Sequence, residues 1–254
     1  MKLKSYFLLY LIACAAICLS VVSCSLQGTH APLPEALAAL QSDSDVLFTQ
    51  VAVPDWDNEN YYVFQPKAAP ASKALVFYGG ATCDARDYAP MAREIARAGF
   101  MMVLVKMPGD ISFSAPDRAA TVIAAFPGIK TWAIGGHSMG GISACQFARE
   151  HLDTISAVVL WASWPSPQNK IDQTDLKALS ISATNDGIYP PVKIKWSHAM
   201  LPADTVYVVI QGGNHGQFAW CTGDFKPVDH TATITLDEQS AQTVAATVSF
   251  LNSL

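Results

Sequence analysis

Three residues carry the side chains needed for nucleophilic catalysis, in the order serine, aspartate, histidine along the chain. Ser138 lies in Gly136-His-Ser-Met-Gly140, between an apolar run and an amphipathic run. Asp186 and His215 each come shortly after a later apolar run. A neutral histidine can take the proton of a serine hydroxyl, and a carboxylate can fix the imidazole tautomer. The pattern predicts a triad of Ser138, Asp186 and His215.

The surroundings of Ser138 predict a strand, a sharp turn and a helix, with the serine at the turn. Glycines on both sides leave room for a backbone conformation that exposes the hydroxyl. The free N–H groups of a helix N-terminus can stabilise an oxyanion. We expect one donor to be the N–H of Met139 and the second to be that of Gly80, with Ala81 as the alternative.

Other histidines and aspartates compete for the triad. His137 belongs to the turn itself, where its side chain diverges from Ser138, so we expect it to be structural. His230 is the main alternative to His215, because it follows in the same loop region. Three other aspartates precede a strand instead of following one: Asp172, Asp175 and Asp204.

The elements that would position these residues alternate between apolar strands and amphipathic helices, which predicts an α/β fold with a mostly parallel sheet and helices on both faces. The first two strands favour an antiparallel pair at the edge of the sheet. Ligands bind such sheets at the carboxyl ends of the strands. We expect strands at 47–53, 61–65, 100–105, 156–161, 178–183 and 205–210, one from Ala74 and one ending at Gly136, with helices at 87–98, 117–125, after Ser138 and at 237–251.

The first residues predict export. Met1-Lys-Leu-Lys4 is a positively charged start, and residues 5–22 form an almost unbroken apolar run. The run ends in Val21-Val-Ser-Cys24, which is similar to the lipobox of bacterial lipoproteins and implies a lipid on Cys24 and a membrane anchor in the cell envelope. A plain secretory signal or an uncleaved anchor helix is the alternative. We expect a signal peptide at 1–23, a tether at 24–44 and an α/β domain at 45–254.

Composition excludes several classes of function. The chain has 254 residues, of which 51% are hydrophobic, which suits one α/β domain after the signal. It has 16 basic against 21 acidic side chains and no basic stripe, so we do not expect nucleic acid as a partner. The sequence has no dinucleotide-binding glycine motif, no phosphate loop and no paired histidines at metal-ligand spacing. We expect neither a cofactor nor a metal.

Three motifs resemble the α/β-hydrolase superfamily, over roughly residues 45–254: Phe77-Tyr-Gly-Gly80, Gly135-Gly-His-Ser-Met-Gly-Gly141 and Gly212-Gly-Asn-His-Gly-Gln-Phe218. Within it, the chain is similar to small esterase-like proteins related to dienelactone hydrolases. The resemblance implies a Ser-Asp-His hydrolase, in agreement with the predicted triad, and adds little about specificity. We expect a serine hydrolase that cleaves small or lipid-like carboxylic esters through an acyl-enzyme. An amidase, a peptidase or an acyltransferase could use the same triad. A non-catalytic binding lipoprotein on this scaffold is a further alternative.

Members of this superfamily often carry a lid domain after the strand that corresponds here to 156–161. Only residues 162–177 are available for one, so we expect a shallow, open site without a lid. Trp164 stands in this connection, in a place similar to the substrate-stacking tryptophan of secreted polyester hydrolases, and Trp220 follows His215. Both could form an apolar wall for a substrate, or pack beneath loops.

Three cysteines follow Cys24 in the sequence. Cys83 and Cys221 lie in loops that leave the same edge of the expected sheet, so we expect a disulfide between them in an oxidising compartment, with two unpaired thiols as the alternative. Cys145 falls on the helix after Ser138, where we expect a buried thiol.

Overall fold

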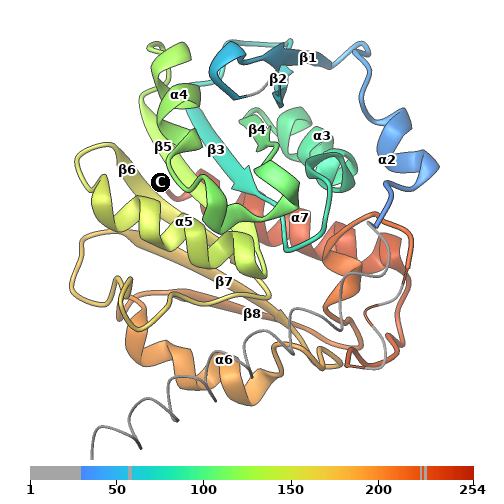
Figure 1. Ribbon diagram of the computed structural model, residues 1–254, viewed down its shortest axis with the longest axis vertical. Helices are drawn as coiled ribbons and strands as arrows, with labels where there is room; N and C mark the ends of the chain where they lie inside the picture. Colours follow the sequence, from blue (N-terminus) through green and yellow to red (C-terminus); the bar gives the residue numbers. More distant parts are fainter. Residues whose placement is uncertain (1–29, 57–58, 224, 226–227) are drawn as a thin grey trace, which may run out of the picture. The chain divides into compact units, whose positions relative to one another are not determined.

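An eight-stranded sheet forms the centre of this computed structural model, which describes residues 30–56, 59–223, 225 and 228–254 (Figure 1). The strands are β1 Val46–Ala52, β2 Asn60–Pro66, β3 Lys73–Tyr78, β4 Met101–Val105, β5 Thr131–His137, β6 Ile155–Trp161, β7 Lys177–Ala183 and β8 Val206–Ile210. Their order in the sheet is β1-β2-β4-β3-β5-β6-β7-β8. β2 pairs antiparallel with β1 and β4, and all later pairs are parallel. The predicted mostly parallel sheet with an antiparallel edge is confirmed.

Helices cover both faces of the sheet (Figure 1). The α-helices are α2 Pro34–Ala38, α3 Ala89–Arg97, α4 Arg118–Ala125, α5 Met139–Glu150, α6 Pro191–Ser197 and α7 Leu236–Asn252. Short 3₁₀ turns lie in the connections between strands and helices, at Pro54–Trp56, Ala85–Tyr88, Pro108–Asp110, Ser112–Ser114, His198–Met200 and Gly216–Phe218. α6, absent from the expected set, is a short helix that begins with a proline, so it has little of the periodicity by which a longer helix is recognised.

Alternating side chains divide the core between the two faces. In β3, Leu75 and Phe77 join the cluster that includes residues of α3 and α7, whereas Val76 and Tyr78 join the cluster that includes residues of α4 and α5. Successive residues of a strand point to opposite faces, so a strand buried on both faces has to be apolar throughout. This double burial explains the continuous apolar runs in the sequence.

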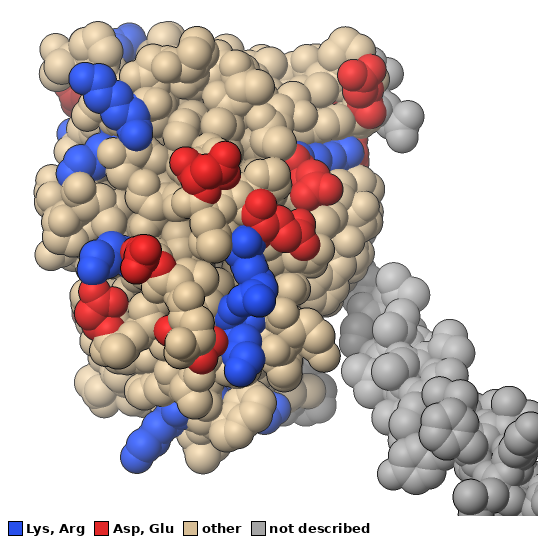
Figure 2. All heavy atoms as spheres, turned by 90° about the vertical axis from the view of Figure 1, so that its left-hand side faces the viewer, with Lys and Arg blue, Asp and Glu red and all other residues tan. Residues whose placement is uncertain are grey.

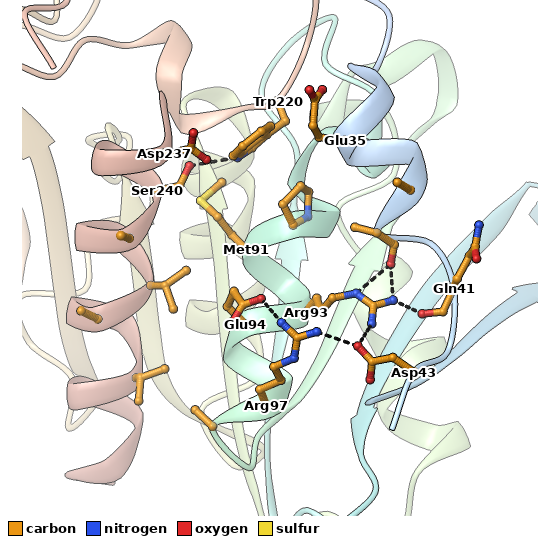
Figure 3. A pocket seen from close by; sticks show the side chains of 18 of the residues that line it. Glu35, Gln41, Asp43, Met91, Arg93, Glu94, Arg97, Trp220, Asp237 and Ser240 are labelled. Carbon is orange, nitrogen blue, oxygen red and sulfur yellow. Dashed lines mark hydrogen bonds and ion pairs between the residues drawn. The ribbon is translucent and has the colours of Figure 1, made fainter. Parts of the chain in front are cut away.

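The domain begins at Ala31, earlier than the predicted boundary at residue 45. Residues 31–44 were expected to be tether, but Ala36 is fully buried and the guanidinium of Arg93 binds the backbone oxygen of Ala39 (Nε···O 3.1 Å) and the carboxylate of Asp43 (2.5 Å; Figure 3). This contact was missed because a short Ala/Leu stretch carries no sign of a distant arginine.

Residues 1–23 and Cys24 lie outside the described residues, so the predicted signal peptide and lipidation site are predictions still. In the part of the chain that the structure describes, none of the helices has the length and apolar character needed to cross a membrane. On the face in Figure 2, basic and acidic side chains are interspersed among uncharged ones. Residues 162–176, between β6 and β7, contain neither helix nor strand, so no lid domain is built there.

Candidate active site

Ser138 stands between β5 and α5 in a backbone conformation that is rare for a residue with a side chain. Its φ is 53° and its ψ is −123°. Such conformations cost about 1–3 kcal/mol and persist only where neighbouring contacts hold them. Here the N–H of Ser138 donates to the Trp161 carbonyl (3.0 Å), and Ser163 Oγ donates to the Ser138 carbonyl (2.6 Å). The strained turn expected from the sequence is therefore present, and β6 and the residues after it hold it.

Glycines let the turn close against β3. A Cβ at Gly140 would lie 2.1 Å from the carbonyl oxygen of Tyr78, and one at Gly136 would lie 2.3 Å from the carbonyl carbon of Gly140. Real Cβ atoms do not approach backbone atoms so closely, so any larger residue at either position would push α5 away from the sheet. These glycines therefore determine the position of α5. They also determine the position of the Met139 N–H, because Met139 is the first residue of that helix.

Asp186 and His215 meet after β7 and β8, as predicted. His215 Nδ1 lies 2.8 Å from Asp186 Oδ2, and both side chains are almost fully buried. The other carboxylate oxygen, Oδ1, accepts the N–H groups of Ile188 (2.9 Å) and Tyr189 (2.6 Å). The carboxylate is thus held by its own loop and selects the tautomer in which Nδ1–H donates, so Nε2 is the nitrogen left to accept a proton.

A buried carboxylate that sequence reasoning missed joins the loops of Asp186 and His215. Asp229 Oδ1 accepts the N–H groups of Gly187 (3.0 Å) and His215 (3.3 Å), and Oδ2 accepts that of Gly216 (2.9 Å). Its Oδ1 also accepts the N–H of His230 (3.0 Å). The side chain of His230 is exposed, whereas that of His215 is buried on Asp186. The structure therefore places His215, and not His230, on the aspartate.

The expected oxyanion donor Gly80 is wrong, because its N–H is already used. It donates to the hydroxyl oxygen of Tyr88 (2.9 Å), which shares a second hydrogen bond with His137 Nδ1 (2.9 Å). Burial, and then the nearby His215, lower the pKa of His137 well below its usual range, so this ring is neutral. His137 has the structural place expected for it. The alternative donor, Ala81, is the next residue of the same loop.

Tyr189 is a further residue at the site that the sequence did not reveal. Burial raises the pKa of Tyr189, and the nearby Ser138 hydroxyl partly opposes this rise. Its ring is nearly perpendicular to that of His215, with 5.3 Å between centroids. The ring of Tyr189 also packs against that of Trp164, with 4.0 Å between centroids. Trp164 and Tyr189 thus form an aromatic pair beside Ser138, on the side where a substrate wall was expected.

Trp220 is not part of this wall. Its indole Nε1 donates to Ser240 Oγ on α7 (2.9 Å), and its backbone N–H donates to the carbonyl of Asp87 (2.8 Å). The ring lines a groove of about 850 Å³ between α2, α3 and α7 (Figure 3), whose lining includes none of the three triad candidates. Trp220 therefore has the second of the two positions considered for it, packed beneath a loop, because the loop after His215 turns back toward α7.

The predicted disulfide between Cys83 and Cys221 is absent from the structure, where both are free thiols. Their proximity was predicted correctly, because the two sulfurs lie within 4.8 Å of each other. A hydrogen bond with Cys221, together with burial, raises the pKa of the Cys83 thiol. Burial, and then the nearby Cys83, raise the pKa of Asp87 to about 9. Cys145 on α5 is fully buried, as expected.

Comparisons with known proteins agree with this fold. The Alpha/beta hydrolase family matches residues 74–241. A crystal structure of a predicted CIB-like hydrolase from Thermoplasma acidophilum superposes with a TM-score of 0.61 at 15% identity, covering 82% of this chain and 100% of that one. A dienelactone hydrolase from Anabaena variabilis gives 0.58 at 15% identity, covering 79% and 96%. A dienelactone hydrolase-like promiscuous phosphotriesterase from metagenomic libraries gives 0.61 at 15% identity, covering 83% and 99%.

No curated protein sequence gives a significant match. At such low identities the solved structures establish only the fold. The family match establishes membership of the family, because it runs from β3 into α7 and spans more than half of the chain. The superfamily expected from the three motifs is confirmed: the chain belongs to the alpha/beta hydrolase family and is a hydrolase.

Proposed function

We propose that the protein hydrolyses carboxylic esters through an acyl-enzyme formed on Ser138. The observation that carries the proposal is the buried Asp186–His215 pair beside a serine with a strained backbone. Strain at a nucleophile is expected where the turn has to present Oγ to a substrate. The buried carboxylate stabilises the imidazolium that forms when His215 takes the serine proton.

In the first step, His215 Nε2 accepts the hydroxyl proton of Ser138 while Oγ attacks the ester carbonyl. The N–H groups of Met139 and Ala81 donate to the resulting oxyanion, since Met139 opens α5 and Ala81 follows the Gly80 whose N–H is occupied. The imidazolium then returns the proton to the departing alcohol. In the second step, His215 takes a proton from water as the water oxygen attacks the acyl carbonyl. The bond to Ser138 Oγ then breaks, the acid leaves, and the imidazolium returns its proton to Oγ.

The aromatic pair of Trp164 and Tyr189 supplies the wall against which an acyl or aryl group packs. Tyr189 packs against His215 and lies near Ser138, so a flat substituent stacked beside it stays close to the reacting atoms. Aromatic pairs contribute about 0.5–1.5 kcal/mol beyond the burial of their area. The 162–176 connection has no helix or strand that could close over the site, which favours small or flat esters that bind without lid closure.

The test is a panel of p-nitrophenyl esters of increasing acyl length, with p-nitroacetanilide as the matched amide. We expect ester turnover, and a fall in kcat of on the order of 10⁴-fold or more in Ser138→Ala. Ester turnover that Ser138→Ala leaves intact would refute the proposal. Faster cleavage of the anilide would identify an amidase, and faster release in the presence of an added alcohol would identify an acyltransferase.

We also propose that the chain is exported and anchored by a lipid on Cys24. The support is the sequence: Lys2 and Lys4, then the apolar run 5–22, then Val21-Val-Ser-Cys24. Two or more acyl chains on Cys24 would hold the protein stably at the membrane. The mature protein should partition with membranes and carry acyl mass on Cys24, and Cys24→Ala should remove both properties. Recovery of an unmodified wild-type protein from the soluble fraction would contradict the proposal.

A further inference from the structure

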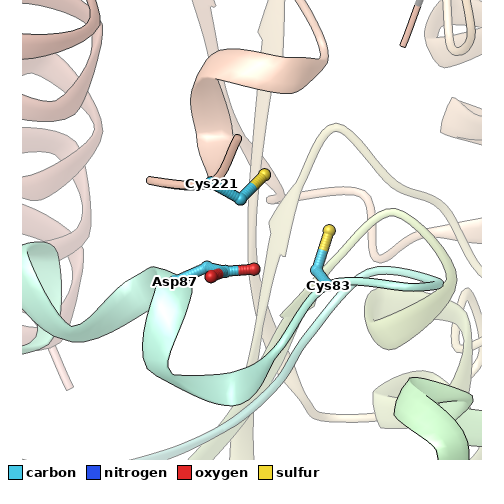
Figure 4. A group of neighbouring side chains, drawn as sticks. All are labelled: Cys83, Asp87 and Cys221. Atoms are coloured by element: carbon cyan, nitrogen blue, oxygen red, sulfur yellow. The ribbon is translucent and has the colours of Figure 1, made fainter. Parts of the chain in front are cut away.

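Two thiols and a carboxyl group outside the triad converge at one place. Cys83 follows β3 in the loop that contains Gly80 and Ala81, Asp87 lies in the 3₁₀ turn Ala85–Tyr88, and Cys221 follows the His215 loop. The two sulfurs and a carboxylate oxygen all lie within 4.8 Å of one another. In Figure 4 the carboxyl group of Asp87 points toward the space between the two cysteines. Three loops distant in sequence thus bring possible metal ligands together.

The carboxyl group of Asp87 has no hydrogen-bond partner in the described part of the chain, although the residue is fully buried. Its backbone is fully engaged, because its N–H donates to the carbonyl of Asp84 (3.0 Å) and its carbonyl accepts the N–H of Trp220 (2.8 Å). A buried carboxyl without a partner costs several kcal/mol, so native proteins rarely keep one without a ligand or a function. The Asp87 carboxyl group is directed at the two thiols, so a ligand of this carboxyl would also contact sulfur.

We propose that Cys83, Cys221 and Asp87 bind a thiophilic divalent cation, Zn²⁺. Two sulfurs and one carboxylate oxygen suit zinc, because thiolates select it over Mg²⁺ and Ca²⁺. Zn–S bonds of about 2.3 Å and Zn–O bonds of about 2.1 Å in a tetrahedron require S···S near ~3.8 Å and S···O near ~3.6 Å. Because the three ligand atoms lie within 4.8 Å of one another, no pair exceeds these separations by more than about 1.2 Å, a shift that side-chain rotations can supply. Cys221 is partly exposed, so water completes the coordination on its side.

A zinc ion satisfies the whole cluster, whereas a disulfide would satisfy only part of it. A bond between Cys83 and Cys221 would leave the Asp87 carboxyl buried and unpaired, but an ion binds all three groups. The two thiolates alone neutralise both charges of the ion, and with the Asp87 carboxylate the site carries one net negative charge. The bound ion would tie the loop of the oxyanion donor Ala81 to the loop of His215, since each loop contributes a ligand. The zinc proposal itself does not depend on the proposed esterase activity.

The test is a titration of the reduced protein with Co²⁺, whose thiolate charge-transfer absorbance reports sulfur ligands. We expect one Co²⁺ per chain, displaced by Zn²⁺, and an increase in Tm on addition of Zn²⁺. Cys83→Ala and Cys221→Ala should lose the charge-transfer band, and Asp87→Asn should weaken binding at least tenfold. Cys145→Ala is the matched control, because Cys145 is a buried thiol on α5 outside the cluster, and it should bind Co²⁺ as the wild type does.

A second measurement keeps the proposal testable if a variant fails to fold. In the wild-type protein, Zn²⁺ should slow alkylation of Cys83 and Cys221 and leave that of Cys145 unchanged, as read by peptide mass spectrometry. Three results would overturn the zinc site: no stoichiometric Co²⁺ binding by the reduced wild type, undiminished affinity in folded Asp87→Asn, or a Cys83–Cys221 disulfide in protein exported by its host in the presence of zinc.

Discussion

Asp229 should be a positioning residue for catalysis, and Asp229→Asn tests this with little change of shape. The carboxylate of Asp229 accepts four backbone N–H groups, and three of them belong to the loops of Asp186 and His215: those of Gly187, His215 and Gly216. Asparagine keeps an acceptor at Oδ1 but places an NH₂ group where Oδ2 accepts the N–H of Gly216. The substitution thus replaces the hydrogen bond from Gly216 by an unfavourable contact between two donors. The other three hydrogen bonds remain, but their acceptor is no longer charged.

The magnitude follows from these contacts. A hydrogen bond to a charged group contributes about 1.5–3 kcal/mol, so losing one and weakening three should cost about 2–4 kcal/mol of unfolding free energy. In a domain of this size that corresponds to a fall in Tm of about 4–16 °C. A displacement of about 1 Å in a catalytic group can cost on the order of 100-fold in rate. We therefore expect kcat/KM for p-nitrophenyl acetate to fall by about 10- to 100-fold in molecules that remain folded.

The assay compares Asp229→Asn with wild type and with Asp175→Asn at a temperature where circular dichroism shows all three proteins folded. Asp175 is exposed, so its substitution removes the same charge without touching the two loops, and it should leave both Tm and kcat nearly unchanged. A purely structural role would lower only the Tm of Asp229→Asn. Wild-type kcat in the folded variant would therefore refute a positioning role for Asp229.

Three further outcomes are expected from the geometry. Trp164→Ala should raise KM for aryl esters by about 5- to 30-fold, since about 1–2 kcal/mol of aromatic contact is lost, and should change acetate esters of small alcohols less. Gly140→Ala should lower the free energy of unfolding by more than about 3 kcal/mol, as measured by denaturant titration, because the new Cβ would lie 2.1 Å from the carbonyl oxygen of Tyr78. Gly128→Ala is the control: its Cβ would point into open space, and it should change the free energy of unfolding by less than about 1 kcal/mol. Because the pKa of buried His137 is lowered, the unfolded chain protonates this histidine below about pH 6.5 while the folded protein does not. The free energy of unfolding should therefore fall as pH falls below that value, by up to about 1.4 kcal/mol per pH unit. His137→Asn should reduce this slope.

The sheet and the three triad candidates could be predicted because their signals are local. β5, β7 and β8 are apolar runs, and Ser138, Asp186 and His215 follow the points where those runs end. In a parallel sheet these ends share one edge, so sequence order alone brings the three residues to the same edge. The boundaries of most strands differ by only one or two residues from those expected, because strand burial produces the same runs.

The remaining features depend on contacts between distant segments. By their place in the sequence, Gly80 and Ala81 are equally suited to be the oxyanion donor. What distinguishes them is the hydrogen bond from the N–H of Gly80 to the hydroxyl of Tyr88, which the sequence does not reveal. Asp229 stands in a polar loop, where its buried hydrogen bonds to Gly187 and Gly216 leave no pattern in the sequence. Trp220 follows His215 closely, yet its hydrogen bond to Ser240 turns the ring toward α7.

The central claim is that Ser138 is the nucleophile, and the most direct test is to locate a covalent adduct. The protein is treated with a fluorophosphonate, digested, and its peptides are mapped by mass spectrometry. We predict a single phosphonylated residue, Ser138, with labelling lost in Ser138→Ala and strongly slowed in His215→Ala, because the imidazole no longer takes the hydroxyl proton. An adduct on another residue, or undiminished labelling in Ser138→Ala, would contradict the account.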